Sequence, residues 1–190
     1  MLRIWELNTD PNRHLFIQTV DLRYFNERFN GSPISDDWEI PAYDVLNRSK
    51  KVADFTSWQV GSQVFLVSPL ARDLISQLDE SAVEFLPFDR IKGRKLYVAN
   101  VLRTEDFLDL ARTEFQEGSG LPVRVAWRAG LPDALPPIFK VKGGSDTYVS
   151  TDFGRKAVEH RITGLRLADP AKNRFQQIVR GEQINEFPGL

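Results

Sequence analysis

The sequence predicts an α+β fold, made mainly of an antiparallel sheet of short strands with two or three short helices. Short runs of apolar and β-branched residues recur along the chain, and most of them are closed by a glycine, a proline or a polar turn. Helical patterns with a recognisable start are few. Helices therefore cannot cross over between every pair of strands, so antiparallel connections must dominate.

The predicted strands follow from alternation and from turn residues. The stretch 14–29 fits either a strand or a helix, and 30–41 is a loop because Gly31, Pro33 and Pro41 interrupt it. The segment 122–127 alternates strictly, which is typical of a strand with one solvent-exposed face. A turn is predicted at 143–146. The remaining strands are predicted at 2–7, 63–68, 82–88, 94–102, 137–142, 147–150 and 162–167.

Two helices are predicted, each directly after a Val-Ser pair. Ser68 is placed to cap a helix that has Pro69 at its first position and an apolar stripe along one face. Ser150 is placed to cap a second helix with a shorter stripe. The stripes consist of Leu70, Leu74, Ile75 and Leu78 in the first helix and of Phe153, Ala157 and Val158 in the second. Duplication of one unit and two independent uses of a common helix start both explain this repetition.

The apolar faces of these elements predict the core. A chain of 190 residues buries roughly 70% of the surface that its unfolded form exposes, so it needs no covalent cross-links. The expected core members are Leu74, Leu78, Phe85, Val98, Phe139, Val149, Phe153 and Leu165.

The residues give no sign of catalytic, metal-binding or cofactor-binding chemistry. Cysteine is absent, which excludes disulfides, thiol catalysis and cysteine-bound zinc and fits a cytoplasmic location. His14 and His160 lack the spacing of metal ligands, and neither Ser68 nor Ser150 lies in a nucleophile-elbow motif. We therefore expect no catalytic residue, no metal and no cofactor. The polar start of the chain and its short apolar runs predict no signal peptide and no membrane contact.

The net charge of −1 conceals an asymmetry along the chain. Residues 1–119 carry 14 Lys and Arg against 19 Asp and Glu, whereas residues 120–190 carry 11 against 7. Neither part shows the dense basic stripe that contacts to phosphates require, so we expect no nucleic-acid partner.

One loop has the composition of a protein-binding site. Four carboxylates surround two aromatic residues on a segment bounded by prolines, and the group consists of Asp36, Asp37, Trp38, Glu39, Tyr43 and Asp44. Aromatic anchors ringed by charge are typical of interface hot spots, and carboxylates steer a basic partner. The alternative is that Trp38 folds back into the core and the acidic side chains only face water.

Short motifs of two to five residues follow one another from residue 31 to residue 165. They are Gly31 and Trp38; Asp54-Phe55; Val67-Ser68 with Leu74 and Leu78; Glu84-Phe85-Leu86-Pro87; Tyr97 with Asn100-Val101; Leu108-Asp109; Ile138-Phe139; Tyr148-Val149-Ser150; and Thr163-Gly164-Leu165. In this order and spacing the chain resembles, from about 25 to 168, the immunity proteins of bacterial polymorphic toxin systems, of the myxobacterial type. It departs from that pattern after Asp109, where Ala111 and Arg112 follow.

This resemblance implies a cytoplasmic protein that binds and neutralises a cognate bacterial toxin without catalysis. It implies one immunity-type domain over 1–190, or that domain divided into subdomains 1–93 and 94–168, with a polar tail at 169–190. Two other functions stay open, namely a small enzyme of unknown reaction and an adaptor or scaffold module.

Overall fold

The structure is a computed structural model that describes residues 3–19, 28–58, 64–117, 122–142, 144, 146–172 and 187–189. Strands predominate in it and nearly all neighbouring strands run antiparallel, which confirms the predicted α+β class. The stretch 20–27, residue 63, part of the turn at 143–146 and most of the tail at 169–190 lie outside the described residues.

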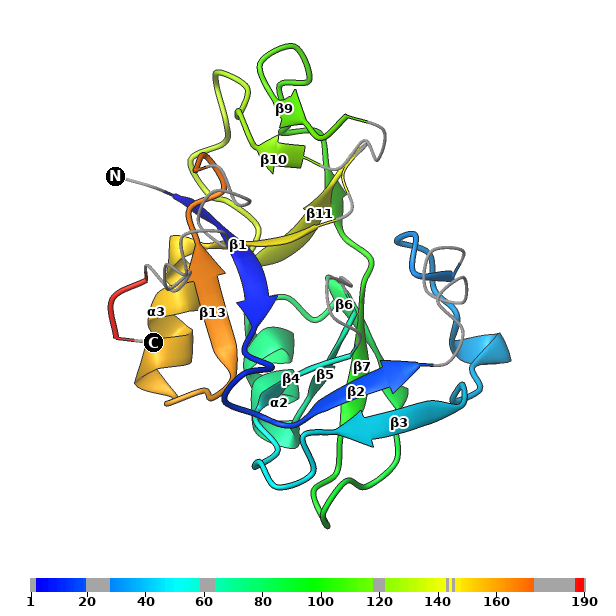
Figure 1. The fold of residues 1–190 in the computed structure, drawn as a ribbon. Helices are drawn as coiled ribbons and strands as arrows, with labels where there is room; N and C mark the ends of the chain where they lie inside the picture. Colours follow the sequence, from blue (N-terminus) through cyan, green and yellow to red (C-terminus); the bar gives the residue numbers. More distant parts are fainter. Residues whose placement is uncertain are drawn as a thin grey trace.

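The largest sheet joins the two ends of the described chain. Its order is β13-β1-β12-β11-β8, and all its neighbours are antiparallel except β11 and β8. The first strand therefore lies between two strands from the second half of the chain (Figure 1). The bounds are β1 Ile4–Thr9, β8 Thr104–Glu105, β11 Ile138–Val141, β12 Thr147–Ser150 and β13 Leu165–Ala168.

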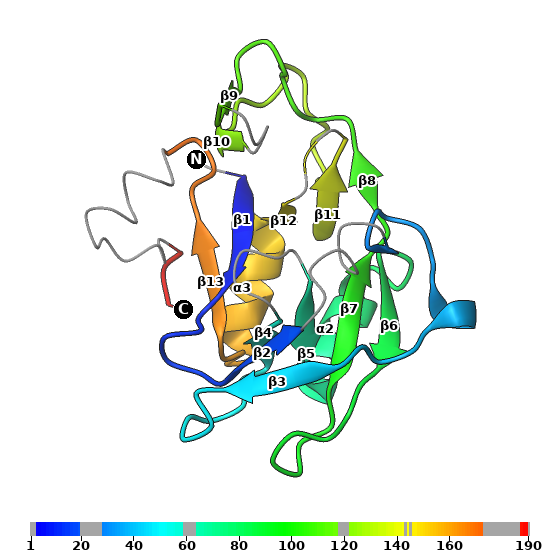
Figure 2. The ribbon, with the colours of Figure 1, turned by 45° about the vertical axis from the view of Figure 1, so that its right-hand side comes forward.

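A second sheet is built entirely from the middle of the chain. It has the order β4-β5-β7-β6, with every pair antiparallel. Two short ribbons, β2–β3 and β9–β10, form separate two-stranded sheets, and β2–β3 lies against the four-stranded sheet, where Ile17 bridges Trp58 (Figure 2). The bounds are β2 Phe16–Thr19, β3 Tyr43–Leu46, β4 Phe55–Ser57, β5 Phe65–Val67, β6 Val83–Pro87, β7 Tyr97–Val101, β9 Glu114–Phe115 and β10 Pro122–Arg124.

Central strands of both sheets are buried on their two faces. In β5 the side chains of Phe65 and Val67 join one core cluster, while Leu66 between them joins another. In β11 the same alternation separates Ile138 from Phe139. Because successive side chains of a strand point to opposite faces, a strand between two core clusters has a continuous apolar sequence.

Both predicted helices are present, and both serines cap them. Helix α2 spans Pro69–Leu78 and helix α3 spans Thr151–Glu159. The Ser68 hydroxyl accepts a hydrogen bond from the Ala71 amide at 3.3 Å, and Ser150 Oγ accepts one from the Phe153 amide at 3.2 Å. Each hydroxyl thus satisfies an amide that has no partner within the helix.

The prediction that Leu70 belongs to the apolar stripe of the first helix is wrong. Its side chain is 45% exposed, and Ala71 takes the buried position together with Leu74 and Ile75. At 3.6 residues per turn, Leu70 lies about 90° around the helix from the centre of that stripe. Six of the eight predicted core residues are buried, and the other two, Leu78 and Phe85, pack partly exposed against the first cluster.

Several element boundaries differ from the prediction. The first strand begins at Ile4, two residues later than expected, and β10 covers only 122–124. The described part of the ambiguous stretch 14–29 contains strand β2, and the 30–41 loop contains a single 3-10 turn, η1, at Ser35–Asp37. Over the described ranges, no helix is long and apolar enough to cross a membrane.

Candidate partner-binding surface

At its beginning the segment 28–44 passes close to β8 at Gly31 and is held to the four-stranded sheet by an amide side chain. Gly31 has a φ of +94°, which a residue with a side chain rarely adopts, and a Cβ there would meet Thr104 Oγ1 at 3.2 Å. One residue further, the carbonyl of Ser32 accepts a hydrogen bond of 2.9 Å from Asn100 Nδ2 on β7. These contacts fix the chain where it enters the acidic loop.

Glu84 on β6 is the central anchor of this segment. Its carboxylate accepts hydrogen bonds of 3.0 Å from the amides of Ile34 and Ser35 and from Asn100 Nδ2. Burial alone would raise the pKa of Glu84, but these donors together hold it below its ordinary value. The ionised carboxylate therefore binds the start of η1, and it does so through backbone groups that no sequence motif reveals.

Lys140 on β11 supplies another anchor. Its Nζ donates a hydrogen bond of 2.8 Å to the carbonyl of Phe29, just before the loop begins. The side chain is buried, and burial lowers the pKa of Lys140 to about 8. A charged amine inside the protein is costly unless it is bonded, so this contact ties the start of the segment to the five-stranded sheet.

The four carboxylates of the loop are all exposed. Asp36 and Asp37 lie in η1, Glu39 follows it, and Asp44 lies on β3. The carbonyl of Asp37 accepts a hydrogen bond of 3.1 Å from the Arg28 guanidinium, which holds the backbone of the turn. A backbone fixed by bonds from other elements thus presents the acidic side chains to solvent.

The two aromatic residues of the loop pack inward and are partly buried. Trp38 Nε1 donates a hydrogen bond of 2.8 Å to the carbonyl of Pro87, and its ring meets Phe29 and Trp58 edge to face, with centroids 6.1 and 6.3 Å away. Such ring pairs add to the stabilisation from burial. Trp38 therefore contributes to the second core cluster, as the alternative for this loop expected.

Tyr43 is similarly engaged. Its hydroxyl donates a hydrogen bond of 2.8 Å to Asp89, and its ring lies 5.0 Å from that of Phe88. Burial, followed by the bond to Asp89 and the charge of Asp89, raises the pKa of Tyr43 to about 12. Within this segment the four predicted carboxylates are exposed to solvent, and the two predicted aromatic rings pack on the core. Contact of this surface with a partner stays a prediction.

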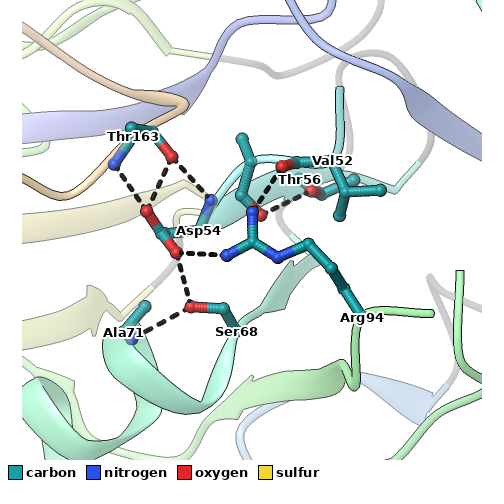
Figure 3. Close-up of polar contacts among 8 residues, drawn as sticks. Val52, Asp54, Thr56, Ser68, Ala71, Arg94 and Thr163 are labelled. Atoms are coloured by element: carbon teal, nitrogen blue, oxygen red, sulfur yellow. Dashed lines mark hydrogen bonds and ion pairs between the residues drawn. The ribbon is translucent and has the colours of Figure 1, made fainter. Parts of the chain in front are cut away.

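A polar junction that sequence reasoning did not anticipate lies where β4 begins and β5 ends, and its Asp54 and Ser68 are buried. Asp54 is at its centre (Figure 3). The carboxylate accepts bonds from the Ser68 hydroxyl at 2.8 Å and from the Thr163 hydroxyl at 2.6 Å, and it pairs with Arg94 at 3.1 Å. Burial would raise the pKa of Asp54, but hydrogen bonds from Thr163 and Ser68 and the Arg94 charge lower it below its ordinary value.

The contacts of this junction give it a structural role. The Ser68 hydroxyl donates a hydrogen bond to Asp54 and accepts one from the Ala71 amide, so both of its hydrogen-bonding capacities are used within the fold. Gly164 follows Thr163 with a φ of +79°, and a Cβ there would lie 2.2 Å from the Phe55 carbonyl. Most of these residues belong to the short motifs of the sequence, which gave no indication that they touch one another. No group of three or more potential metal ligands occurs within the described ranges.

Two comparisons with known proteins complete this description. The model of the immunity protein family (Imm11) matches residues 13–172, which is most of the chain. A search of the curated proteins finds no significant match.

Proposed function

The chain belongs to the immunity protein family Imm11, and from this membership we propose that it binds a cognate bacterial toxin and neutralises it without catalysing a reaction. In this proposal it acts in the cytoplasm of the bacterium that produces the toxin of a polymorphic toxin system. Its contact surface is the acidic loop with Asp36, Asp37, Trp38, Glu39, Tyr43 and Asp44.

One observation carries the choice of surface. The acidic loop is exposed at its carboxylates but fixed in its backbone, because Glu84 and Asn100 bind the chain from β6 and β7. A loop that is already ordered loses little conformational entropy when a partner binds, so more of the contact energy appears as affinity. Tight inhibition by a small protein depends on such preorganisation.

Charge gives the expected character of the partner. Four exposed carboxylates on one loop create a negative potential that attracts a basic surface and raises the rate of encounter. The toxin is therefore expected to present a basic face to η1 and to the start of β3. Screening by salt weakens this attraction, since the Debye length is about 8 Å at physiological ionic strength.

The experiment is co-expression with the product of the adjacent toxin gene, in which survival and co-purification are measured. We expect the wild-type chain to protect cells and to co-purify with the toxin. Asp36→Asn/Asp37→Asn/Asp44→Asn should protect less well. Glu80→Gln/Glu117→Gln/Asp133→Asn removes the same charge from exposed positions elsewhere and should protect fully.

Other outcomes would support the rival functions. Protection without a stable complex, accompanied by chemical change of the toxin or its product, would favour an enzyme. Binding to several unrelated proteins without loss of any toxin activity would favour an adaptor. Full protection by the loop variant would leave the family assignment in place but would move the contact surface elsewhere.

A further inference from the structure

Six cationic residues lie at one end of the molecule, on two loops far apart in the sequence. We call them the basic ridge, and they are Arg48, Lys50, Lys51, Arg90, Lys92 and Lys95. The loops that carry them, 47–51 and 89–95, lie together at the end of β3 opposite η1 in both views (Figures 1 and 2). Lys92 Nζ joins them directly by donating a hydrogen bond of 2.8 Å to the carbonyl of Lys50.

Within the part of the chain that the structure describes, the six charges of the ridge have no carboxylate partners, although Arg94 on the same loop pairs with Asp54 at 3.1 Å. Among the described residues, none of its six members forms an ion pair, whereas Arg103, Arg124 and Arg128 pair with acids within 3 Å. Where ridge side chains are bonded, the acceptors are backbone carbonyls. Examples are Asn12 O for Lys50, Val45 O for Arg48 and Gly93 O for Arg90. Neutral carbonyls orient these cations and leave their positive charge uncompensated.

The conformation of Lys92 is a second observation on the same loop. Lys92 has a φ of 50° and Gly93 a φ of 78°, and Ile91 and Arg94 exchange both of their backbone hydrogen bonds. This is a type I′ turn, whose first central position favours Asn, Asp or Gly. A lysine is therefore held there in a backbone conformation that residues with a Cβ disfavour, with its side chain exposed on the ridge.

From these observations we propose that the basic ridge is a second contact region for the protein partner, which presents an acidic patch to it. The inference rests on the proposed function for the nature of the partner as a protein. Strand β3 runs from the acidic loop to the ridge, with Asp44 on the strand and Arg48 two residues beyond its end. The partner then carries a basic patch next to an acidic patch, and the two opposite pairings fix its orientation.

The surroundings of the ridge favour a folded protein over a long polyanion. Asp89 lies directly beside Arg90, and the four carboxylates of the acidic loop lie at the other end of β3. Nucleic acid and anionic membranes need a continuous positive track, which these acids interrupt. The separate carboxylates of a protein surface fit between such neighbours.

The test measures binding of a peptide of about 12 residues, in which glutamates are separated by glycine and serine, to the full-length protein by titration calorimetry, at low salt and at about 0.15 M salt. The ridge variant is Lys51→Gln/Lys92→Asn, in which Asn suits the turn better than Lys does. The matched control is Lys142→Gln/Arg161→Asn, which removes two exposed charges and also places Asn at a positive φ, since Arg161 has a φ of 53°.

We expect the wild-type protein to bind the probe, and binding to weaken with salt. The ridge variant should bind about fivefold more weakly, the effect of losing two exposed charge pairs, while the control should equal the wild type. The melting temperature of the ridge variant should be equal to or above that of the wild type, which excludes misfolding as the cause of weaker binding. Equal binding by both variants overturns the inference, as does tighter ridge-dependent binding of a 20-nucleotide RNA or of phosphatidylserine vesicles. These assays contain no toxin, so a failure here is distinct from failure of the co-expression experiment.

Discussion

Asp54 and Thr163 are joined by three hydrogen bonds although 109 residues separate them in the chain. The carboxylate of Asp54 accepts from the Thr163 hydroxyl at 2.6 Å and from its amide at 3.0 Å, and the Asp54 amide donates to the Thr163 hydroxyl at 3.0 Å. Because Asp54 precedes β4 and Thr163 precedes β13, these bonds tie the two main sheets together.

Replacing this carboxylate should weaken the fold. In Asp54→Asn the new amide donates where the native carboxylate accepts, so at least one of the donors from Ser68, Thr163 and Arg94 loses its acceptor. Hydrogen bonds to charged groups are each worth about 1.5–3 kcal/mol, and we expect a loss of about 3 kcal/mol in the free energy of unfolding. Urea denaturation measures it, and Asp133→Asn at an exposed position serves as the control. A loss below about 0.5 kcal/mol would contradict the assigned role.

Stability should fall with acidification. The pKa values of Asp54 and Glu84 are lower in the folded protein than the ordinary values of 3.8 and 4.5. The unfolded chain therefore takes up protons first, so the stabilisation is complete above the ordinary values and is lost as the pH falls through the folded ones. Unfolding free energies measured between pH 7 and pH 2 should show this slope. Asp54→Asn and Glu84→Gln should each make the slope shallower, and an unchanged slope in both would exclude these groups as its source.

The two capping serines should differ in their effect on stability. Ser150→Ala removes one cap bond, to the Phe153 amide, and should cost about 1 kcal/mol. Ser68→Ala removes the corresponding bond to Ala71 and also the donor to Asp54, so its cost should be larger. Thermal denaturation of both variants measures the difference. Inhibition of the toxin at low temperature should survive in both, and its loss in a fully folded Ser68→Ala protein would contradict a purely structural role.

Lys140 should make stability rise at alkaline pH. Its pKa is about 8 in the folded protein against an ordinary value of 10.5, so the unfolded chain binds more protons between these values. The free energy of unfolding therefore increases as the pH rises from about 8 to about 10.5. Lys140→Met should lose this increase and should be at least as stable as the wild type at pH 7, since it buries no charge. The exposed Lys142→Met should keep the increase, and identical pH profiles for the two variants would refute the assignment.

Acids and rings of the loop should affect different rate constants of toxin binding. Neutralising Asp36, Asp37 and Asp44 should slow association and reduce its salt dependence, because exposed charges act mainly on the encounter. An anchoring ring acts after encounter, so Tyr43→Ala should speed dissociation. If Tyr43 is a hot spot, the free energy of binding should weaken by about 2 kcal/mol. Surface plasmon resonance at two salt concentrations separates these effects.

Trp38 requires a milder change because its indole packs on Phe29 and Trp58. Trp38→Phe keeps an aromatic ring but removes the donor to the Pro87 carbonyl. Faster dissociation of the toxin with an unchanged melting temperature would support a role in binding. A lower melting temperature with unchanged kinetics would show that the ring serves only the core.

The sequence alone determined the local elements of this protein. Alternating and continuous apolar runs located strands such as 65–67 and 138–141, because successive side chains of a strand point to opposite faces and the sequence therefore reflects which faces are buried. Ser68 and Ser150 could be assigned as caps because a cap bonds to an amide only three residues away. Composition also indicated the exposed carboxylates of the acidic loop.

Only the tertiary structure decided which distant residues meet. Glu84 binds amides 50 and 49 residues away, and Lys140 reaches a carbonyl 111 residues away. Such contacts depend on the path of the whole chain and on backbone groups that every residue carries, so no local pattern marks them. The basic ridge arises in the same way. Its two loops have ordinary charge content, and they form one surface because the fold brings them together, as the hydrogen bond from Lys92 to the Lys50 carbonyl shows.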